Sequence, residues 1–87
     1  MPSNKKKIKR IKHKDGCLEY REYLNGKHHG KWISWYPDGI KDYEGEYLNG
    51  ERHGKSTWWR LNGNIRYESE YDNGDLIPNE KRYEKQQ

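Results

Sequence analysis

The sequence is poor in the residues that build a thick hydrophobic core. Only 29% of its 87 residues are hydrophobic, phenylalanine is absent, and no long apolar run occurs. A chain of this length forms at most one domain, and so few apolar residues cannot fill a two-layer core. No stretch approaches the length of a transmembrane helix, which argues against a membrane span.

Cysteine is almost absent as well. Cys17 is the single cysteine, so no internal disulfide forms and a reducing compartment is expected. The N-terminal residues are basic and lack the apolar segment of a secretory signal. We therefore expect a cytoplasmic protein.

What the sequence does contain is aromatic rings and unevenly placed charge. It has four Trp and eight Tyr, whereas disordered chains are poor in aromatic residues, so we expect it to fold. Residues 1–14 carry seven Lys and Arg and no acid, and from Asp15 onward eleven basic residues stand against fourteen acidic ones. This is a basic extension on a mildly acidic body.

The chain repeats itself with a period of 24 residues. The stretch "EYLNG" occurs at 22–26 and again at 46–50, and "EYDNG" follows at 70–74. The same spacing relates His29 to His53, Gly30 to Gly54, Trp35 to Trp59 and Tyr43 to Tyr67. A fixed period in this range is typical of a repeat architecture. We therefore expect a basic extension or edge strand at 1–14, a repeat sheet at 15–74 and a cap or tail at 75–87.

Glycine-containing turns divide each repeat into two strands. A three-residue loop at 37–39 suits Pro37 at its first position, and Gly39 takes the positive φ that ends such a loop. Equivalent slots occur at 14–16 and 61–63. The pattern predicts hairpins joined in an antiparallel meander.

The loop at 37–39 also predicts which side chains share a face. It places Ser34 opposite Asp42 and Ile33 opposite Tyr43, with side chains alternating between the faces. The acids Glu44 and Glu46 then lie on the other face. The sequence thus predicts an all-β, single-layer twisted sheet with one charged face and one aromatic face. The predicted aromatic face consists of Trp35, Tyr43, Tyr47, Trp59, Tyr67 and Tyr71.

The stretch "YEGEYLNGERHGKSTWWRLNG" at 43–63 resembles the MORN (membrane occupation and recognition nexus) repeat. The usual unit of that repeat is a Tyr-x-Gly-x-aromatic-x-Asn-Gly hairpin followed by a Gly-Lys strand. The resemblance covers roughly residues 16–74 and is greatest to the variant found in bacterial antitoxin-like or immunity-like proteins and in large viruses. It implies an elongated single-layer antiparallel sheet and a non-enzymatic binding scaffold.

No group of residues has the pattern of a catalytic, cofactor or metal site. His29 and His53 occupy equivalent positions, and His28 precedes the first of them. They are metal ligands or a general base, or else structural residues before a turn glycine. The second interpretation is favoured, because a metal site needs three or four converging ligands. We expect no enzymatic activity, no metal and no cofactor.

The aromatic face is the candidate binding site. Its rings stabilise the sheet through cross-strand pairs, but a single layer leaves them without a cover, and large apolar surfaces generally have a partner. We expect a protein partner, either toxin-like or a second copy of the chain in a homodimer. A short C-terminal helix beginning at Asn79 and carrying Tyr83 is a further candidate to cover part of this face.

The basic N-terminus leaves two interpretations open. Lysines on an edge strand protect it from aggregation, whereas the same cations are also suited to an anionic partner. That partner is either an anionic membrane or phosphoinositide surface or, less favoured because the repeat body is acidic, a single-stranded nucleic acid. The candidate residues are Lys5, Lys6, Lys7, Lys9, Arg10 and Lys12.

Overall fold

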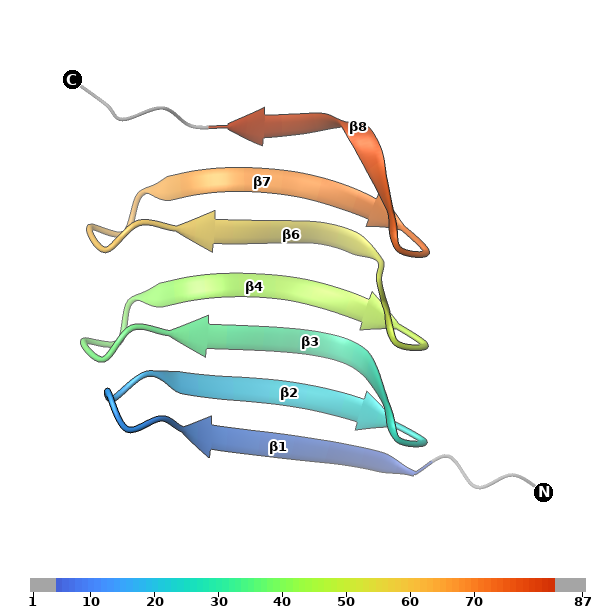
Figure 1. The fold of residues 1–87 in the computed structure, drawn as a ribbon, viewed down its shortest axis with the longest axis horizontal. Helices are drawn as coiled ribbons and strands as arrows, with labels where there is room; N and C mark the ends of the chain where they lie inside the picture. Colours follow the sequence, from blue (N-terminus) through green and yellow to red (C-terminus); the bar gives the residue numbers. More distant parts are fainter. Residues whose placement is uncertain (1–4, 83–87) are drawn as a thin grey trace.

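The computed structural model describes residues 5–82 of the chain, with side chains for residues 5–78. These residues form one antiparallel sheet (Figure 1). Its strands are β1 (Lys6–Lys12), β2 (Leu18–Leu24), β3 (Lys27–Trp35), β4 (Lys41–Leu48), β5 (Glu51–Arg52), β6 (Gly54–Trp59), β7 (Ile65–Asp72) and β8 (Asp75–Arg82). The spatial order is β1-β2-β3-β4-β6-β7-β8, and the short β5 pairs with β4. The predicted all-β antiparallel meander is confirmed.

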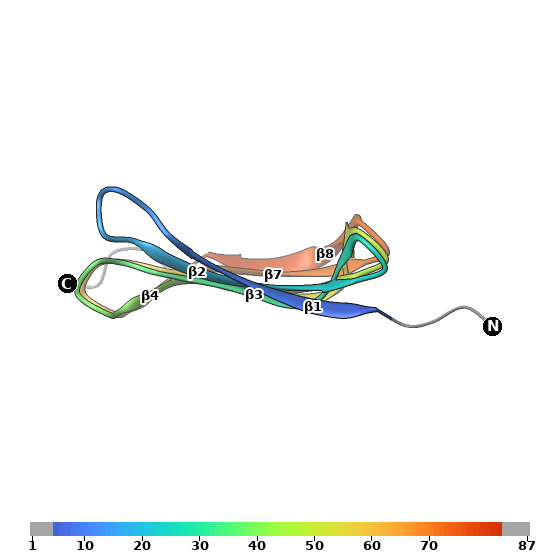
Figure 2. The ribbon, with the colours of Figure 1, turned by 90° about the horizontal axis from the view of Figure 1, so that it is seen from below.

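The sheet is a single layer. Its thinnest dimension is 13 Å, and Figure 2 shows it edge-on as one curved layer without a second layer over either face. Tyr43, 9% exposed, is the only buried hydrophobic residue in the part of the chain that the structure describes. Stability therefore comes from contacts along the two faces. No helix capable of crossing a membrane occurs between residues 5 and 82.

Two kinds of turn alternate at the two ends of the strands. At one end, Asn25 and Gly26 have φ values of 51° and 81°, which is the two-residue hairpin turn that Asn-Gly favours. Asn49-Gly50 and Asn73-Gly74 repeat it. At the other end, the predicted three-residue loop at 37–39 is confirmed, because the Tyr36 amide donates to the Ile40 carbonyl at 2.8 Å.

A bulge follows that loop and changes the register. Trp35 pairs with Lys41, but Ser34 then pairs with Tyr43, so Asp42 is an extra residue in β4. The predicted pairings of Ser34 with Asp42 and of Ile33 with Tyr43 are wrong for this reason, and Ile33 pairs with Glu44. A bulge sets two residues of one strand against one of its neighbour, and every pair beyond it moves by one position.

The next hairpin contains the same bulge. Trp59 pairs with Ile65 and Trp58 with Tyr67, which leaves Arg66 as the extra residue in β7. The recurrence at equivalent positions makes the bulge a feature of the repeat. Its consequence is that Trp58, and not Trp59, shares a face with Tyr43 and Tyr67.

The predicted C-terminal helix is wrong as far as Arg82, the last residue that the structure describes. Residues 75–82 form β8, in which Leu76 pairs with Tyr71 and Ile77 with Glu70. A helix this short is marginal in water, whereas a strand here pairs with the otherwise open edge of β7. Pro78 lies where the β7–β8 register shifts, a position at which a strand tolerates proline. Tyr83 lies outside the described residues.

Candidate functional site

One face of the sheet carries a continuous series of ring contacts. His28 stacks on Trp32 with ring centroids 4.7 Å apart, and Trp32 meets Tyr43 edge-on at 6.4 Å. Tyr43 contacts Trp58 at 4.9 Å, and Trp58 contacts Tyr67 at 5.0 Å. We call this surface the aromatic face. Its rings are Tyr23, His28, Trp32, Tyr43, Tyr47, Trp58, Tyr67 and Tyr71.

The structure divides the predicted set of aromatic residues between the two faces. Tyr43, Tyr47, Tyr67 and Tyr71 lie on the aromatic face. The predicted face of Trp35 and of Trp59 is wrong: both tryptophans lie on the opposite side of the sheet. The bulges after the loops move them there, and Trp58 and Trp32 take their places beside the tyrosines.

Two arginines lie on the rings of the aromatic face. The Arg21 guanidinium is 4.5 Å from the Trp32 ring centroid, which is within the range of a cation–π contact. The Arg52 guanidinium is 5.6 Å from the Trp58 ring and 5.3 Å from the Tyr71 ring. Sequence reasoning did not identify either arginine, because neither belongs to the repeated pattern.

Arg52 also fixes the position of two phenol groups. Its Nε donates to the Tyr47 hydroxyl and its Nη1 to the Tyr71 hydroxyl, both at 3.2 Å. One cation thus joins the two strands that carry Tyr47 and Tyr71. The hydrogen bonds and ring contacts together restrict the rotamers of three neighbouring side chains on this face.

The centre of the aromatic face is packed closely around Tyr43. Its hydroxyl lies 3.4 Å from the Ser56 Oγ, and burial raises the pKa of Tyr43 to about 12. Gly45 leaves the space for this phenol, since a Cβ added at Gly45 would meet the hydroxyl and would lie 2.7 Å from Cζ. The small residue at this position is therefore required by packing.

His28 is the imidazole ring within the aromatic face. It contacts Tyr23 at 4.7 Å and Tyr47 at 5.3 Å in addition to Trp32. Burial, and to a smaller extent the charge of Arg21, lowers the pKa of His28. The neutral imidazole therefore acts here as one more aromatic ring.

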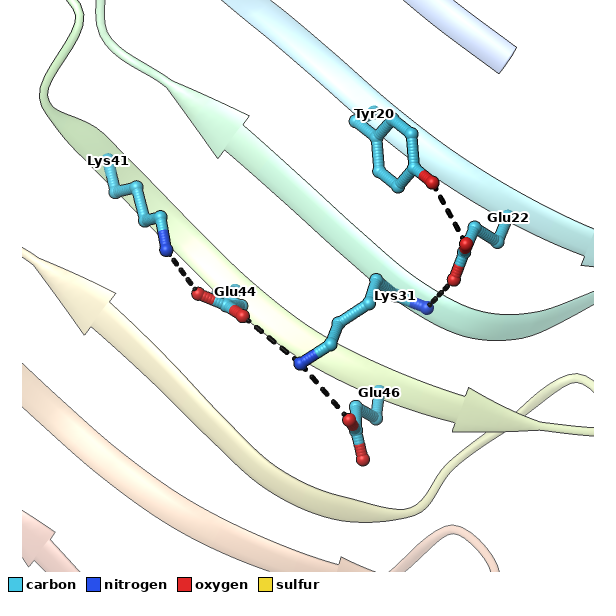
Figure 3. Close-up of polar contacts among 6 residues, drawn as sticks. All are labelled: Tyr20, Glu22, Lys31, Lys41, Glu44 and Glu46. Carbon is cyan, nitrogen blue, oxygen red and sulfur yellow. Dashed lines mark hydrogen bonds and ion pairs between the residues drawn. The ribbon is translucent and has the colours of Figure 1, made fainter. Parts of the chain in front are cut away.

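The opposite surface, which we call the charged face, carries a network of ion pairs (Figure 3). Lys31 Nζ lies 3.3 Å from Glu44 and 3.2 Å from Glu46, and Lys41 Nζ lies 2.7 Å from Glu44. The Lys31 amide donates to the Glu22 carboxylate at 2.7 Å. Exposed pairs contribute only about 0–1 kcal/mol each, so this network neutralises the face more than it stabilises the fold.

The repeated histidines hold the turns of the following repeat. The Asn49 amide donates to His29 Nδ1 at 3.4 Å, and the Asn73 amide donates to His53 Nδ1 at 3.3 Å. No cluster of three or more His, Cys, Asp or Glu side chains capable of holding a metal occurs among the described residues. The two histidines thus satisfy backbone donors that a tight turn leaves open.

The basic residues of the N-terminus form a strand at the edge of the sheet. The register of β1 places Lys7 and Lys9 beside Tyr23 and Arg21, on the aromatic face. Arg10 and Lys12 share the other face with their partners Tyr20 and Leu18. Lys6 lies on that face too, because side chains alternate along β1. The Arg10 guanidinium lies 5.7 Å from the Tyr20 ring. The predicted set of cations is therefore divided between two faces.

Two segments of the chain match a known family. A family model described as MORN repeat variant matches residues 29–49 and 52–73. The resemblance to the MORN repeat is confirmed for these residues. No curated protein and no solved structure matches the chain.

Proposed function

We propose that this chain of two MORN repeat variants is a non-catalytic interaction module that binds a protein partner through its aromatic face. The observation that supports the proposal is the uncovered series of rings. In the part of the chain that the structure describes, no segment lies over them (Figure 2). An extended aromatic surface without a cover is typical of a docking site.

The composition of this surface favours a protein as the partner. Interface cores are enriched in Tyr, Trp and Arg and depleted in Lys and Glu. The aromatic face has the first three, with Arg21 and Arg52 seated on Trp32 and Trp58. Most glutamates of the repeats, and the lysines that pair with them, lie on the charged face. Glu19 is the exception, because its carboxylate bonds to Arg21 and Trp32 on the aromatic face.

The partner proposed for this face is a toxin-like protein. An antitoxin or immunity role follows from the resemblance to bacterial antitoxin-like proteins, and in that role the sheet covers the active surface of the toxin. A broad surface with fixed side chains suits such occlusion, because little conformational entropy is lost when the partner docks.

A crosslinking experiment tests which face is used. The photoreactive amino acid benzoylphenylalanine replaces Tyr71 on the aromatic face in one variant and Lys55 on the charged face in a matched control. Both variants are irradiated in native lysate, and the products are identified by mass spectrometry. We expect one defined adduct from the Tyr71 position and none from the Lys55 position.

The mass of the adduct separates the possible partners. A product of twice the chain mass identifies a homodimer and contradicts binding of a different protein. Adducts from the Lys55 position alone contradict the choice of face. If a gene next to that of this chain encodes a toxin, its lethality on expression should be relieved by the wild-type chain; unrelieved lethality removes the antitoxin role.

A further inference from the structure

The edge strand β1 presents a row of outward backbone groups. Asn25 donates its amide to the Lys5 carbonyl at 2.9 Å, and His13 donates its amide to the Cys17 carbonyl at 2.8 Å. Both bonds point from the ends of β1 toward β2. The β1–β2 register runs from Lys6 to Lys12 without a bulge, so the direction of the backbone groups alternates regularly between these two points.

This alternation identifies the outward residues. The odd-numbered residues of β1 direct N–H and C=O toward β2, and the even-numbered residues direct them away from the sheet. No strand among residues 5–82 pairs with this outer side of β1. The outward residues are Lys6, Ile8, Arg10 and Lys12.

Side chains on both sides of this row are positively charged. Lys7 and Lys9 flank it on the aromatic face, and Arg10 and Lys12 flank it on the charged face. Within β1 itself there is no acidic residue, and Ile8 is 52% exposed. An added strand therefore meets cations on each of its two faces.

A hollow adjoins the strand toward each of its ends. One, of about 430 Å³, is lined by Lys7, Lys9 and Tyr23 together with the first Asn-Gly turn. The other, of about 240 Å³, is lined by Arg10, Lys12, Tyr20 and Trp35 and also by Glu19. The Glu19 carboxylate is already paired with Arg21 and His13. Each hollow combines cationic side chains with an aromatic ring, which suits a side chain that is partly apolar and partly acidic.

We propose that β1 binds an extended acidic peptide segment, which adds to the sheet as a further strand. Main-chain hydrogen bonds to the even-numbered residues supply the register, and carboxylates on both faces of the segment meet the lysines and arginine. This is recognition by strand addition, in which backbone pairing and alternate side chains act together.

A membrane surface fits these observations less well than a peptide does. A flat anionic surface meets the cations of one face of the sheet, whereas those of β1 are divided between two. The phosphates of lipids and nucleic acids accept hydrogen bonds from N–H groups but donate none. They therefore leave the outward C=O groups, half of the outward backbone groups, without a partner. The lysines repel a second copy of β1 through like charge but attract an acidic strand. The same cations can therefore protect the edge from self-association and bind an acidic peptide.

Fluorescence anisotropy with a defined probe tests the proposal on the full chain. The probe is a labelled peptide of about eight residues that repeats the sequence Glu-Glu-Val-Val. Each face of the extended peptide then carries both Glu and Val. Two control peptides have the same sequence with N-methyl groups on the odd or on the even backbone nitrogens. We expect the parent peptide to bind and one or both control peptides to lose at least about tenfold in affinity, because two or more hydrogen bonds are removed.

Variants of the chain locate the site. Ile8→Pro removes an outward N–H and leaves the β1–β2 hydrogen bonds intact, whereas Ile8→Val retains the donor. Peptide affinity should fall for the first and stay unchanged for the second. Lys7→Gln/Lys9→Gln and Arg10→Gln/Lys12→Gln should each weaken binding by about 1.4- to fivefold per cation at low salt.

Hydrogen exchange supplies the decisive pattern. Bound peptide should slow amide exchange at Ile8 and Arg10, while Lys7 and Lys9 are protected with or without peptide. Equal affinity for all three peptides, or no binding of the parent peptide, would overturn the proposal. Tighter binding to phosphatidylserine vesicles or to a single-stranded oligonucleotide, without alternating protection, would replace it with a membrane or nucleic-acid site. Trp58→Phe on the aromatic face should leave peptide affinity unchanged, so this test is independent of the proposed function.

Discussion

Replacing each tryptophan of β6 in turn measures the asymmetry between the two faces. Trp58 contacts the rings of Tyr43 and Tyr67 and the guanidinium of Arg52. Two ring pairs at about 0.5–1.5 kcal/mol each and one cation–π contact at about 0.5–1 kcal/mol give an expected cost of roughly 1.5–4 kcal/mol for Trp58→Ala. Trp58→Phe, which retains a ring, should lose less than half of that.

Trp59→Ala is the matched substitution on the charged face. The Lys41 Nζ lies 5.7 Å from the Trp59 ring, and Ile65 is the cross-strand neighbour. These contacts contribute roughly 0.7–2 kcal/mol together. The Tyr36 hydroxyl donates to the carbonyl of residue 59 at 2.7 Å, a bond that the substitution retains.

Urea unfolding followed by circular dichroism compares the two variants. With a slope of about 1–3 kcal/mol per molar urea for small domains, the midpoint for Trp58→Ala should lie clearly below that for Trp59→Ala. The order depends directly on the bulge in β7, which places Trp58 among the tyrosines. Equal midpoints, or a lower midpoint for Trp59→Ala, would refute the bulged register.

Three further substitutions test individual contacts. Burial lowers the pKa of His28 below its unfolded value of 6.5. The neutral ring therefore contributes its whole stabilisation above pH 6.5, and this contribution to the free energy of unfolding is lost as the pH falls through the folded pKa. His28→Phe should flatten this part of the stability profile, measured by urea titration at several pH values. Gly45→Ala crowds the Tyr43 phenol and should cost about 1–3 kcal/mol in the same titration, unless the ring moves. His29→Ala removes the acceptor for the Asn49 amide and should cost about 0.5–1.5 kcal/mol, with faster exchange of that amide measured by NMR; unchanged exchange would contradict the bond.

The turns were predictable because their chemistry is local. Asn-Gly and Pro-Asp-Gly sequences prefer particular φ values whatever the rest of the fold is. The Asp38 carboxylate accepts from the Ile40 amide at 3.1 Å, and Asn62 accepts from the Asn64 amide at 2.9 Å. Both bonds lie within their own loops. Strand number and order then follow from the spacing of the turns.

The faces of the tryptophans were not predictable from the same signals. Their bulges depend on pairing between neighbouring strands, which loop length alone does not determine. Alignment of the repeats also directed attention to Trp35 and Trp59, which coincide, and away from Trp32 and Trp58, which do not. The signal in the sequence was that Trp and Ser exchange positions between the two repeats: Trp32 corresponds to Ser56, and Ser34 corresponds to Trp58.

That exchange has a packing reason. Trp32 pairs with Gly45, and Ser34 pairs with Tyr43. In the next hairpin Ser56 pairs with Ser69, and Trp58 pairs with Tyr67. On the aromatic face, β3 thus carries Trp32 followed by Ser34, whereas β6 carries Ser56 followed by Trp58. The two tryptophans therefore lie on either side of Tyr43, and both contact it.

A single-layer sheet has no interior, so the residues that stabilise it are also the residues it presents. The bonds of Arg52 to Tyr47 and Tyr71 fix these side chains before any partner arrives. Side chains that are already ordered lose little rotamer entropy on binding. The packing that compensates for a missing second layer therefore also prepares the aromatic face for docking, and it does so without involving the backbone edge of β1.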